Sequence, residues 1–202
     1  MIIFVDGVDK TGKTTLATRL AKELNFEYRK FSKFSDDGCT TATEAIKVLT
    51  KCLQNTNRHY VFDRFYFPCD LIYGPLVDHQ ETHFAVHALY RNVVVPIIQN
   101  ANTVTVHCTA SVDTLVKRFE EENEEYVRPE QIETLLNAYK YLYGSDDGNN
   151  VIKKEGNISK LVINVDSDKR SKDDMFKTVM HELQVLFGEI TMKSLNFARV
   201  LP

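Results

Sequence analysis

The sequence predicts an α/β fold in three layers, in which a five-stranded parallel sheet is flanked by helices. Two observations support this prediction. Short apolar runs of strand length alternate along the chain with longer segments whose apolar residues recur at helical spacing. Strands that alternate with helices require crossover connections, which place the strands parallel and the helices on both faces. The 202 residues, 43% of them hydrophobic, suit one domain over 1–202.

The first strand and helix are the most clearly marked. Residues 2–5, Ile-Ile-Phe-Val, are apolar and mostly β-branched, as a strand buried on both faces requires. Residues 13–24 then place Leu16, Leu20 and Leu24 four apart, which predicts an amphipathic helix. A glycine-containing loop therefore joins the first strand to the first helix.

The same criteria predict the remaining elements in chain order. Further strands are expected at 27–31, in a run that ends at Asp63, at 103–108 and at 160–166. Further helices are expected at about 41–53, 80–100, 111–121, 129–143 and 173–187. Residues 144–150, Gly-Ser-Asp-Asp-Gly-Asn-Asn, predict a turn-forming loop and not a domain linker, since too little chain follows them to build a second core.

Composition excludes some classes of protein. The net charge of −3 and the pI near 6.1 give no overall basic field, so we do not expect stable nucleic-acid binding, although a local cationic site remains compatible. The four cysteines are widely spaced and predict reduced thiols. No apolar run has membrane-spanning length, and the polar residue Asp6 comes too early for a signal peptide. We therefore expect a cytoplasmic protein with no membrane partner.

Residues 7–14 carry the spacing G-x-x-x-x-G-K-T between a predicted strand and a predicted helix. In such a loop, backbone N–H groups point at phosphate oxygens and the helix adds the positive end of its dipole. Lys13 would reach the β- and γ-phosphates, and the Thr14 hydroxyl would hold Mg²⁺. The predicted cofactors are therefore ATP and Mg²⁺. The predicted ATP-binding residues are Gly7, Asp9, Lys10, Thr11, Gly12, Lys13, Thr14 and Thr15.

The predicted third strand ends in Asp63-Arg64, and this pair bears on what receives the phosphate. An ATPase that hydrolyses its nucleotide usually has a carboxylate in the second position, where it positions water. A guanidinium there favours a second phosphate held bidentately, and hence a phosphorylated acceptor. The alternative is that Arg64 merely pairs with a nearby carboxylate. The Asn-Lys-x-Asp sequence that reads guanine in switch proteins does not occur.

Two stretches, "FVDGVDKTGKTT" and "DRFYFPCDLIYG", resemble the thymidylate kinases and related P-loop nucleoside monophosphate kinases. The resemblance implies a three-layer P-loop kinase fold and ATP-dependent phosphoryl transfer to a (deoxy)nucleoside monophosphate. The partners that it implies are small-molecule nucleotides, together with a second copy of the chain in a homodimer. Mg²⁺ would be held through Thr14 and Asp63.

The resemblance also implies roles for single residues. Asp9 would read the 3′-hydroxyl of the acceptor sugar, Lys10 would lie against the transferring phosphates, and Asp63 would be the carboxylate on the Mg²⁺ side. The implied substrate-binding residues are Asp9, Lys33, Arg64, Phe65, Tyr73 and Arg91.

The chain departs from the family pattern in two places. Between the second strand and Asp63 it has room for about one helix, whereas the family has two, the second of which holds thymine. The Tyr-Gly pair at Tyr73 is also displaced by one residue. The base pocket could instead come from 76–100, where Phe84, Tyr90 and Arg91 are available. Thymine specificity is therefore not implied.

The segment 117–130 corresponds to the position of a mobile lid in these kinases. Arg118 and Arg128 are its candidate cations, and five glutamates lie between them. A solvated acidic helix face is the alternative interpretation. With these two arginines, the predicted catalytic residues are Lys13, Lys10, Asp63, Arg64, Arg118 and Arg128.

Two other functions fit the same motifs. One is a kinase that acts on a hydroxyl of a deoxynucleoside or of a modified nucleic-acid base, in which Asp63 or another carboxylate takes a proton. The other is a nucleotide-binding switch without an acceptor. A phosphate acceptor, by contrast, needs no strong general base, because it is already anionic near neutral pH.

Overall fold

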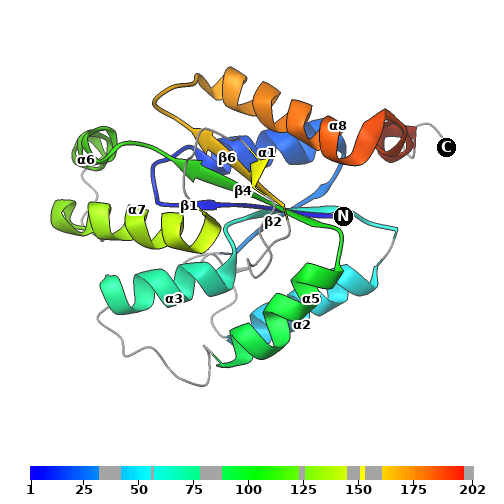
Figure 1. The fold of residues 1–202 in the computed structure, drawn as a ribbon, viewed down its shortest axis with the longest axis horizontal. Helices are drawn as coiled ribbons and strands as arrows, with labels where there is room; N and C mark the ends of the chain where they lie inside the picture. The colour runs from blue at the N-terminus through cyan, green and yellow to red at the C-terminus, as the bar shows by residue number, and fades with distance from the viewer. Residues whose placement is uncertain are drawn as a thin grey trace.

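The computed structural model describes residues 1–31, 42–55, 57–77, 88–122, 126–144, 151–152 and 161–197, without the side chains of 100, 151–152 and 189–197. A central sheet runs through the molecule with helices on both sides (Figure 1). The strands are β1 (Ile2–Gly7), β2 (Glu27–Lys30), β3 (Tyr60–Asp63), β4 (Thr103–Thr109), β5 (Val151–Ile152) and β6 (Val162–Asp166). The helices are α1 (Lys13–Leu24), α2 (Ala42–Gln54), α3 (Tyr66–Leu76), the π-helical turn η1 (Tyr90–Val94), α5 (Val95–Asn100), α6 (Val112–Glu121), α7 (Pro129–Tyr143) and α8 (Lys172–Phe197).

The strand order is β2-β3-β1-β4-β6-β5. The first five of these strands are mutually parallel, which confirms the predicted five-stranded parallel sheet. β5 was not predicted: it adds two residues antiparallel to β6 at the edge, and two residues are too short to show a sequence period. Because parallel strands share a direction, the carboxyl ends of β1, β3 and β4 lie at the same edge of the sheet.

Both faces of the sheet are covered, as the apolar first strand predicts. α1 and α8 cover one face, and α2, α3, α5 and α7 lie on the other (Figure 1). Along β1, Phe4 belongs to the core on the second face, whereas Ile3 and Val5 belong to the core beneath α1. All three are fully buried, so β1 is the centre of both cores.

The element ends follow from local chemistry. α1 ends at Asn25, which adopts the left-handed conformation that asparagine tolerates. α6 starts at Ser111, whose hydroxyl accepts a hydrogen bond from the Thr114 backbone N–H. Of the helix expected at 80–100, the described part starts at 88 and contains the π-helical turn η1. The helix expected to end at 187 continues in α8, but Gly188 interrupts it with a non-helical backbone.

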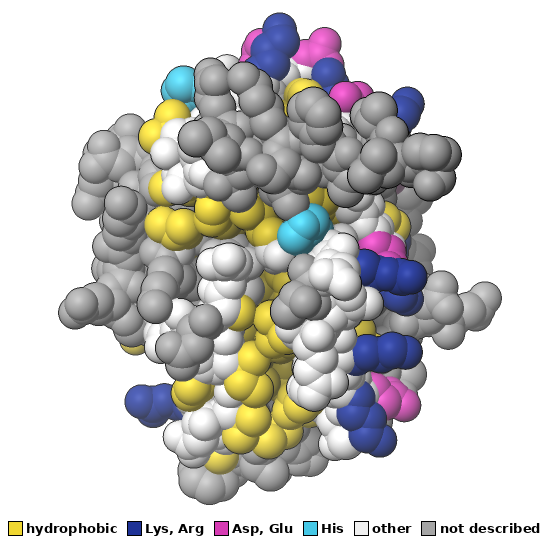
Figure 2. Space-filling view, turned by 90° about the vertical axis from the view of Figure 1, so that its right-hand side faces the viewer, with side chains coloured by type: hydrophobic (Ala, Val, Ile, Leu, Met, Phe, Trp, Pro, Cys, Tyr) yellow, Lys and Arg dark blue, Asp and Glu magenta, His cyan; other side chains and the backbone are white. Residues whose placement is uncertain are grey.

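A band of hydrophobic side chains appears low on the face in Figure 2, where Figure 1 places α2 and α5. Ile46 and Val48 of α2 and Val95 of α5 are only partly buried against the core. The predicted homodimer stays a prediction. In the part of the chain that the structure describes, no helix is both long enough and apolar enough to cross a membrane.

Candidate functional site

The glycine-rich loop connects β1 to α1 at the carboxyl end of the sheet. The Lys13 Nζ donates to the Val8 carbonyl at 2.7 Å, and the Thr11 hydroxyl donates to the same carbonyl at 2.7 Å. Lys10 and Gly12 both have positive φ, 64° and 86°. The loop therefore folds back on itself, and the Lys13 side chain returns to the Val8 carbonyl near its start. A phosphate-binding loop has this curved shape.

Gly7 occupies a position that no other residue can fill without strain. Its φ is +135°, and a Cβ built on it would lie 2.1 Å from the carbonyl oxygen of Cys108 on the neighbouring strand β4. The two residues are partners in the β1–β4 register. The start of the loop is therefore pressed directly against the central sheet.

The Asp9 carboxylate forms ion pairs with both predicted phosphate-binding cations, Lys13 and Arg64. Asp9 Oδ1 lies 3.2 Å from the Lys13 Nζ and also pairs with the Arg64 guanidinium. Burial opposes the ionisation of Asp9, but the charges of Lys13 and Arg64 outweigh it and hold the pKa of Asp9 below its ordinary value. Arg64 has a φ of 74°, and its backbone N–H donates to Val5 of β1 at 2.9 Å. The motif at 7–14 and the Asp63-Arg64 pair thus form one site.

Asp63 ends β3 and lies fully buried beneath α1. Its Oδ2 accepts hydrogen bonds from the Thr14 and Tyr28 hydroxyls, each at 2.8 Å. Its Oδ1 is buried and has no hydrogen-bond donor among the described residues. Because a hydroxyl that donates its proton keeps its lone pairs, Thr14 can still face a cation.

This donor set fits Mg²⁺. Among the described residues, His, Cys, Asp and Glu side chains form no group of three or more that would chelate a metal. Mg²⁺ does not need such a group, because it keeps several waters and binds through one or two carboxylates and substrate phosphates. Thr14 and the Asp63 Oδ1 would hold it, directly or through water.

The end of α6 and the residues after β6 also contact the loop. Lys10 forms an ion pair with Glu122, which caps α6. Arg118 donates to the Lys10 carbonyl at 2.8 Å and to the Ser167 hydroxyl at 2.9 Å. The first part of the predicted lid is therefore the last turn of α6, where Arg118 hydrogen-bonds to the glycine-rich loop. Residues 123–125 of the predicted lid lie outside the described residues.

Searches for a matching family model and for a curated relative found none. Solved structures do match. The YorR protein from Bacillus subtilis, solved in complex with phosphorylated GDP, is 18% identical with a TM-score of 0.60, over 92% of this chain and 96% of that chain. A deoxyadenosine kinase from M. mycoides with bound dATP is 17% identical with a TM-score of 0.59, over 91% of this chain and 100% of that chain. Thymidylate kinase from Candida albicans is 11% identical with a TM-score of 0.63, over 91% of each chain.

The chain has the P-loop kinase fold. The match spans nine-tenths of the chain in each comparison and confirms the predicted architecture. Residues 7–14 are its P-loop, and the contacts described above surround that loop.

Tyr73 reaches the P-loop although the Tyr-Gly spacing is displaced. Its hydroxyl accepts a hydrogen bond from the Asp9 backbone N–H at 3.1 Å. The ring stacks on Tyr126, with 6.2 Å between centroids, and is nearly fully buried. α3 therefore supports the back of the P-loop through Tyr73.

Three predicted site residues lie in the core or at the surface, and the roles of the two surface arginines stay predictions. Phe65 is only 1% exposed and its ring packs on Phe4 with centroids 4.3 Å apart, so it is a core residue rather than a substrate contact. Arg91 is exposed, whereas Tyr90 beside it is buried, because neighbours on a helix face different directions. Arg128 is also exposed and pairs with Glu130 at the start of α7. Lys33 and Phe84 lie outside the described residues.

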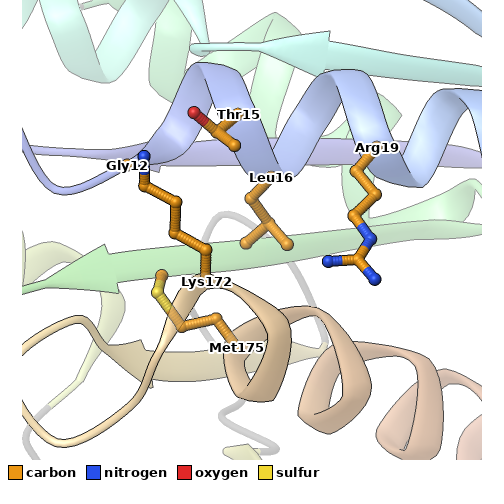
Figure 3. A pocket seen from close by; sticks show the side chains of 6 residues that line it. All are labelled: Gly12, Thr15, Leu16, Arg19, Lys172 and Met175. Atoms are coloured by element: carbon orange, nitrogen blue, oxygen red, sulfur yellow. The ribbon is translucent and has the colours of Figure 1, made fainter.

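A small pocket lies beside the start of α1 (Figure 3). The side chain of Lys172 extends from the start of α8 towards Gly12, and Thr15 lies on the adjacent turn of α1 (Figure 3). The residues that line the pocket are Gly12, Thr15, Leu16, Arg19, Lys172 and Met175. α8 thus places a cation next to the P-loop that no sequence motif indicated.

Sequence reasoning also missed a buried acid beneath the P-loop. Asp6 of β1 is fully buried, and its Oδ2 accepts a hydrogen bond from the Tyr143 hydroxyl at 2.6 Å. Burial raises the pKa of Asp6 to about 6, against the opposing effects of the Tyr143 hydrogen bond and the Lys13 charge. An acidic residue directly after an apolar strand was the available signal, but nothing in the local pattern pointed to Tyr143.

We predict that Asp6 makes the stability of the fold depend on pH. Well below pH 3.8 the carboxyl is protonated in both the folded and the unfolded chain. As pH rises towards 6, the unfolded chain releases this proton first, so the contribution of Asp6 becomes unfavourable and then levels off. Relative to Asp6→Asn, the wild type should lose about 2 kcal/mol of unfolding free energy between pH 4 and pH 7. Urea unfolding of both proteins across this range measures the difference, and a difference independent of pH would contradict the prediction.

Proposed function

We propose that the protein transfers the γ-phosphoryl group of ATP to a (deoxy)nucleoside monophosphate. The observation that supports this most directly is the Asp9 carboxylate, which pairs with Lys13 on one side and Arg64 on the other. A donor phosphate at Lys13 and an acceptor phosphate at Arg64 would therefore lie next to each other. When substrates bind, Lys13 and Arg64 would each contact phosphate oxygens in place of part of their ion pair with Asp9.

On the donor side, the P-loop backbone and the Lys13 ammonium would hold the β- and γ-phosphates, and the start of α1 adds its dipole. Thr14 and Asp63 would hold Mg²⁺, which neutralises charge on the phosphates when bound. Arg118 donates to the Lys10 carbonyl and to the Ser167 hydroxyl, and would hold the P-loop backbone in place during phosphoryl transfer.

On the acceptor side, Arg64 would grip the monophosphate with two parallel N–H bonds. An oxygen of that phosphate would attack the γ-phosphorus, the bond to the β–γ bridging oxygen would break, and ADP would leave. The acceptor is already anionic, so catalysis would consist mainly of positioning and charge neutralisation. The ionised Asp9, supported by Tyr73, is suited to accept a hydrogen bond from a sugar hydroxyl.

A second candidate is a kinase that phosphorylates a deoxynucleoside hydroxyl. Two observations favour it: the likeness in fold to a deoxyadenosine kinase, and the ionised Asp9 carboxylate at the junction between the two cations. In that reaction Asp9 or Asp63 would accept the hydroxyl proton while the oxygen attacks the γ-phosphorus.

The two candidates are separated by coupled ADP release over the common ribo- and deoxynucleoside monophosphates and their unphosphorylated nucleosides. We expect ADP with at least one deoxynucleoside monophosphate and a much lower rate with nucleosides. ADP formation with nucleosides alone would replace the first candidate with the second. ATP turnover that needs no acceptor would instead indicate a nucleotide-dependent switch.

A further inference from the structure

Tyr28 occupies an unusual position for an aromatic residue. It belongs to β2, the edge strand Glu27–Lys30, whose other residues are charged and largely exposed. Tyr28 itself is 36% exposed, so burial of its ring does not explain its place there. Its hydroxyl, however, reaches the end of the neighbouring strand β3 and donates to the fully buried Asp63 at 2.8 Å.

The two oxygens of Asp63 have different surroundings. Oδ2 accepts two protons, one from Thr14 on α1 and one from Tyr28 on β2. A carboxylate oxygen has about two lone-pair positions, so these two donors occupy Oδ2. Oδ1 is equally buried but receives no donor from the described residues. The arrangement leaves Oδ1 as the oxygen that can serve a metal ion or a water bound to it.

Two donors from separate elements also fix the plane of the carboxylate. One hydrogen bond, from Thr14 alone, would let the group turn about its own axis. In the parallel β2–β3 register, Tyr28 lies opposite Val61, two residues before Asp63 on the same strand face. The Tyr28 ring spans this offset, which brings its hydroxyl to Asp63.

We propose that Tyr28 is a positioning residue for the Mg²⁺ of the Mg·ATP complex: it holds Asp63 so that Oδ1 faces the metal. This inference rests on the proposed function, because it assumes that Mg·ATP is the donor. It goes beyond that function by assigning a role to a residue outside both sequence motifs, and by distinguishing the two oxygens of Asp63.

The test is Tyr28→Phe, which removes only the hydroxyl. ATP affinity is measured by isothermal titration calorimetry with Mg²⁺ and, separately, with EDTA. We expect the affinity in EDTA to stay within about twofold of the wild type and the affinity with Mg²⁺ to fall about tenfold, as the loss of a hydrogen bond to a charged group implies. With the acceptor found in the panel assay, kcat should fall about tenfold while the acceptor KM stays unchanged.

Tyr141→Phe is the matched control, because Tyr141 is 92% exposed on α7 and should change none of these quantities. An equal loss of ATP affinity with and without Mg²⁺ would mean that Tyr28 only supports the fold, and an unchanged affinity in both would mean that it has no role; either result overturns the proposal. If the panel assay finds no acceptor, the proposed function fails, but the calorimetry still decides the role of Tyr28.

Discussion

Replacement of Arg64 by alanine is expected to lower kcat/KM for the nucleoside monophosphate acceptor about 100- to 1000-fold, because it removes a bidentate phosphate contact in a site partly shielded from water. Arg64 is 26% exposed and pairs with the P-loop carboxylate Asp9. The affinity for ATP should change much less, since Lys13 and the P-loop backbone remain. Steady-state kinetics with both substrates varied, together with calorimetry for ATP, measure the two effects.

Two further variants sharpen this experiment. Arg64→Lys keeps the positive charge but loses the planar guanidinium that binds a phosphate through two parallel N–H bonds. It should therefore recover only a small part of the kcat/KM lost in Arg64→Ala. Arg58→Ala is the control for removing an arginine away from the site, because Arg58 precedes β3, at the opposite end of this strand from Arg64. Arg58 is 64% exposed and pairs at the surface with Glu27. If Arg64→Ala leaves the acceptor-dependent rate unchanged, Arg64 is a structural partner of Asp9 and the acceptor site lies elsewhere.

Gly7→Ala is expected to have the largest effect on stability, about 4 kcal/mol or more of unfolding free energy. The new Cβ would lie 2.1 Å from the Cys108 carbonyl oxygen. That oxygen belongs to the backbone of β4, in the middle of the sheet, so it cannot move away without breaking the β1–β4 pairing. The φ of +135° adds strain for any residue with a side chain. Urea unfolding, or a shift of the protein to the insoluble fraction on expression, reports the loss.

Gly12→Ala is the matched control within the same loop. Gly12 also has a positive φ, +86°, but a Cβ there would meet nothing within 4 Å. Its cost should therefore be only the left-handed backbone strain, about 1–2 kcal/mol. Equal costs for the two substitutions would show that backbone strain alone, and not the contact with β4, requires Gly7.

The local pattern of the sequence determined the sheet and the two motifs. Period and length are local properties, so the apolar run at 2–5 and the leucines of α1 were enough to predict a strand, a loop and a helix. Parallel strands end at one edge, so the placement of Asp63 and Arg64 beside the P-loop followed from the predicted topology. Of the predicted site residues outside the two motifs, Phe65 lies in the core, whereas Arg91 and Arg128 are exposed and their roles stay predictions.

Only the tertiary structure decided how the side chains of the site pair. Asp9 meets Arg64 across 55 residues of chain, Tyr28 meets Asp63 across 35, and Asp6 meets Tyr143 across 137. No sequence period extends over such separations, because these contacts depend on how β2, β3 and α7 are placed around β1. The sequence by itself therefore determined that a glycine-rich loop joins the first strand to the first helix, and at which edge of the sheet that loop lies. The packing of distant elements determined which carboxylates pair with cations, which accept hydrogen bonds from hydroxyls, and which oxygen of Asp63 receives no donor from the described residues.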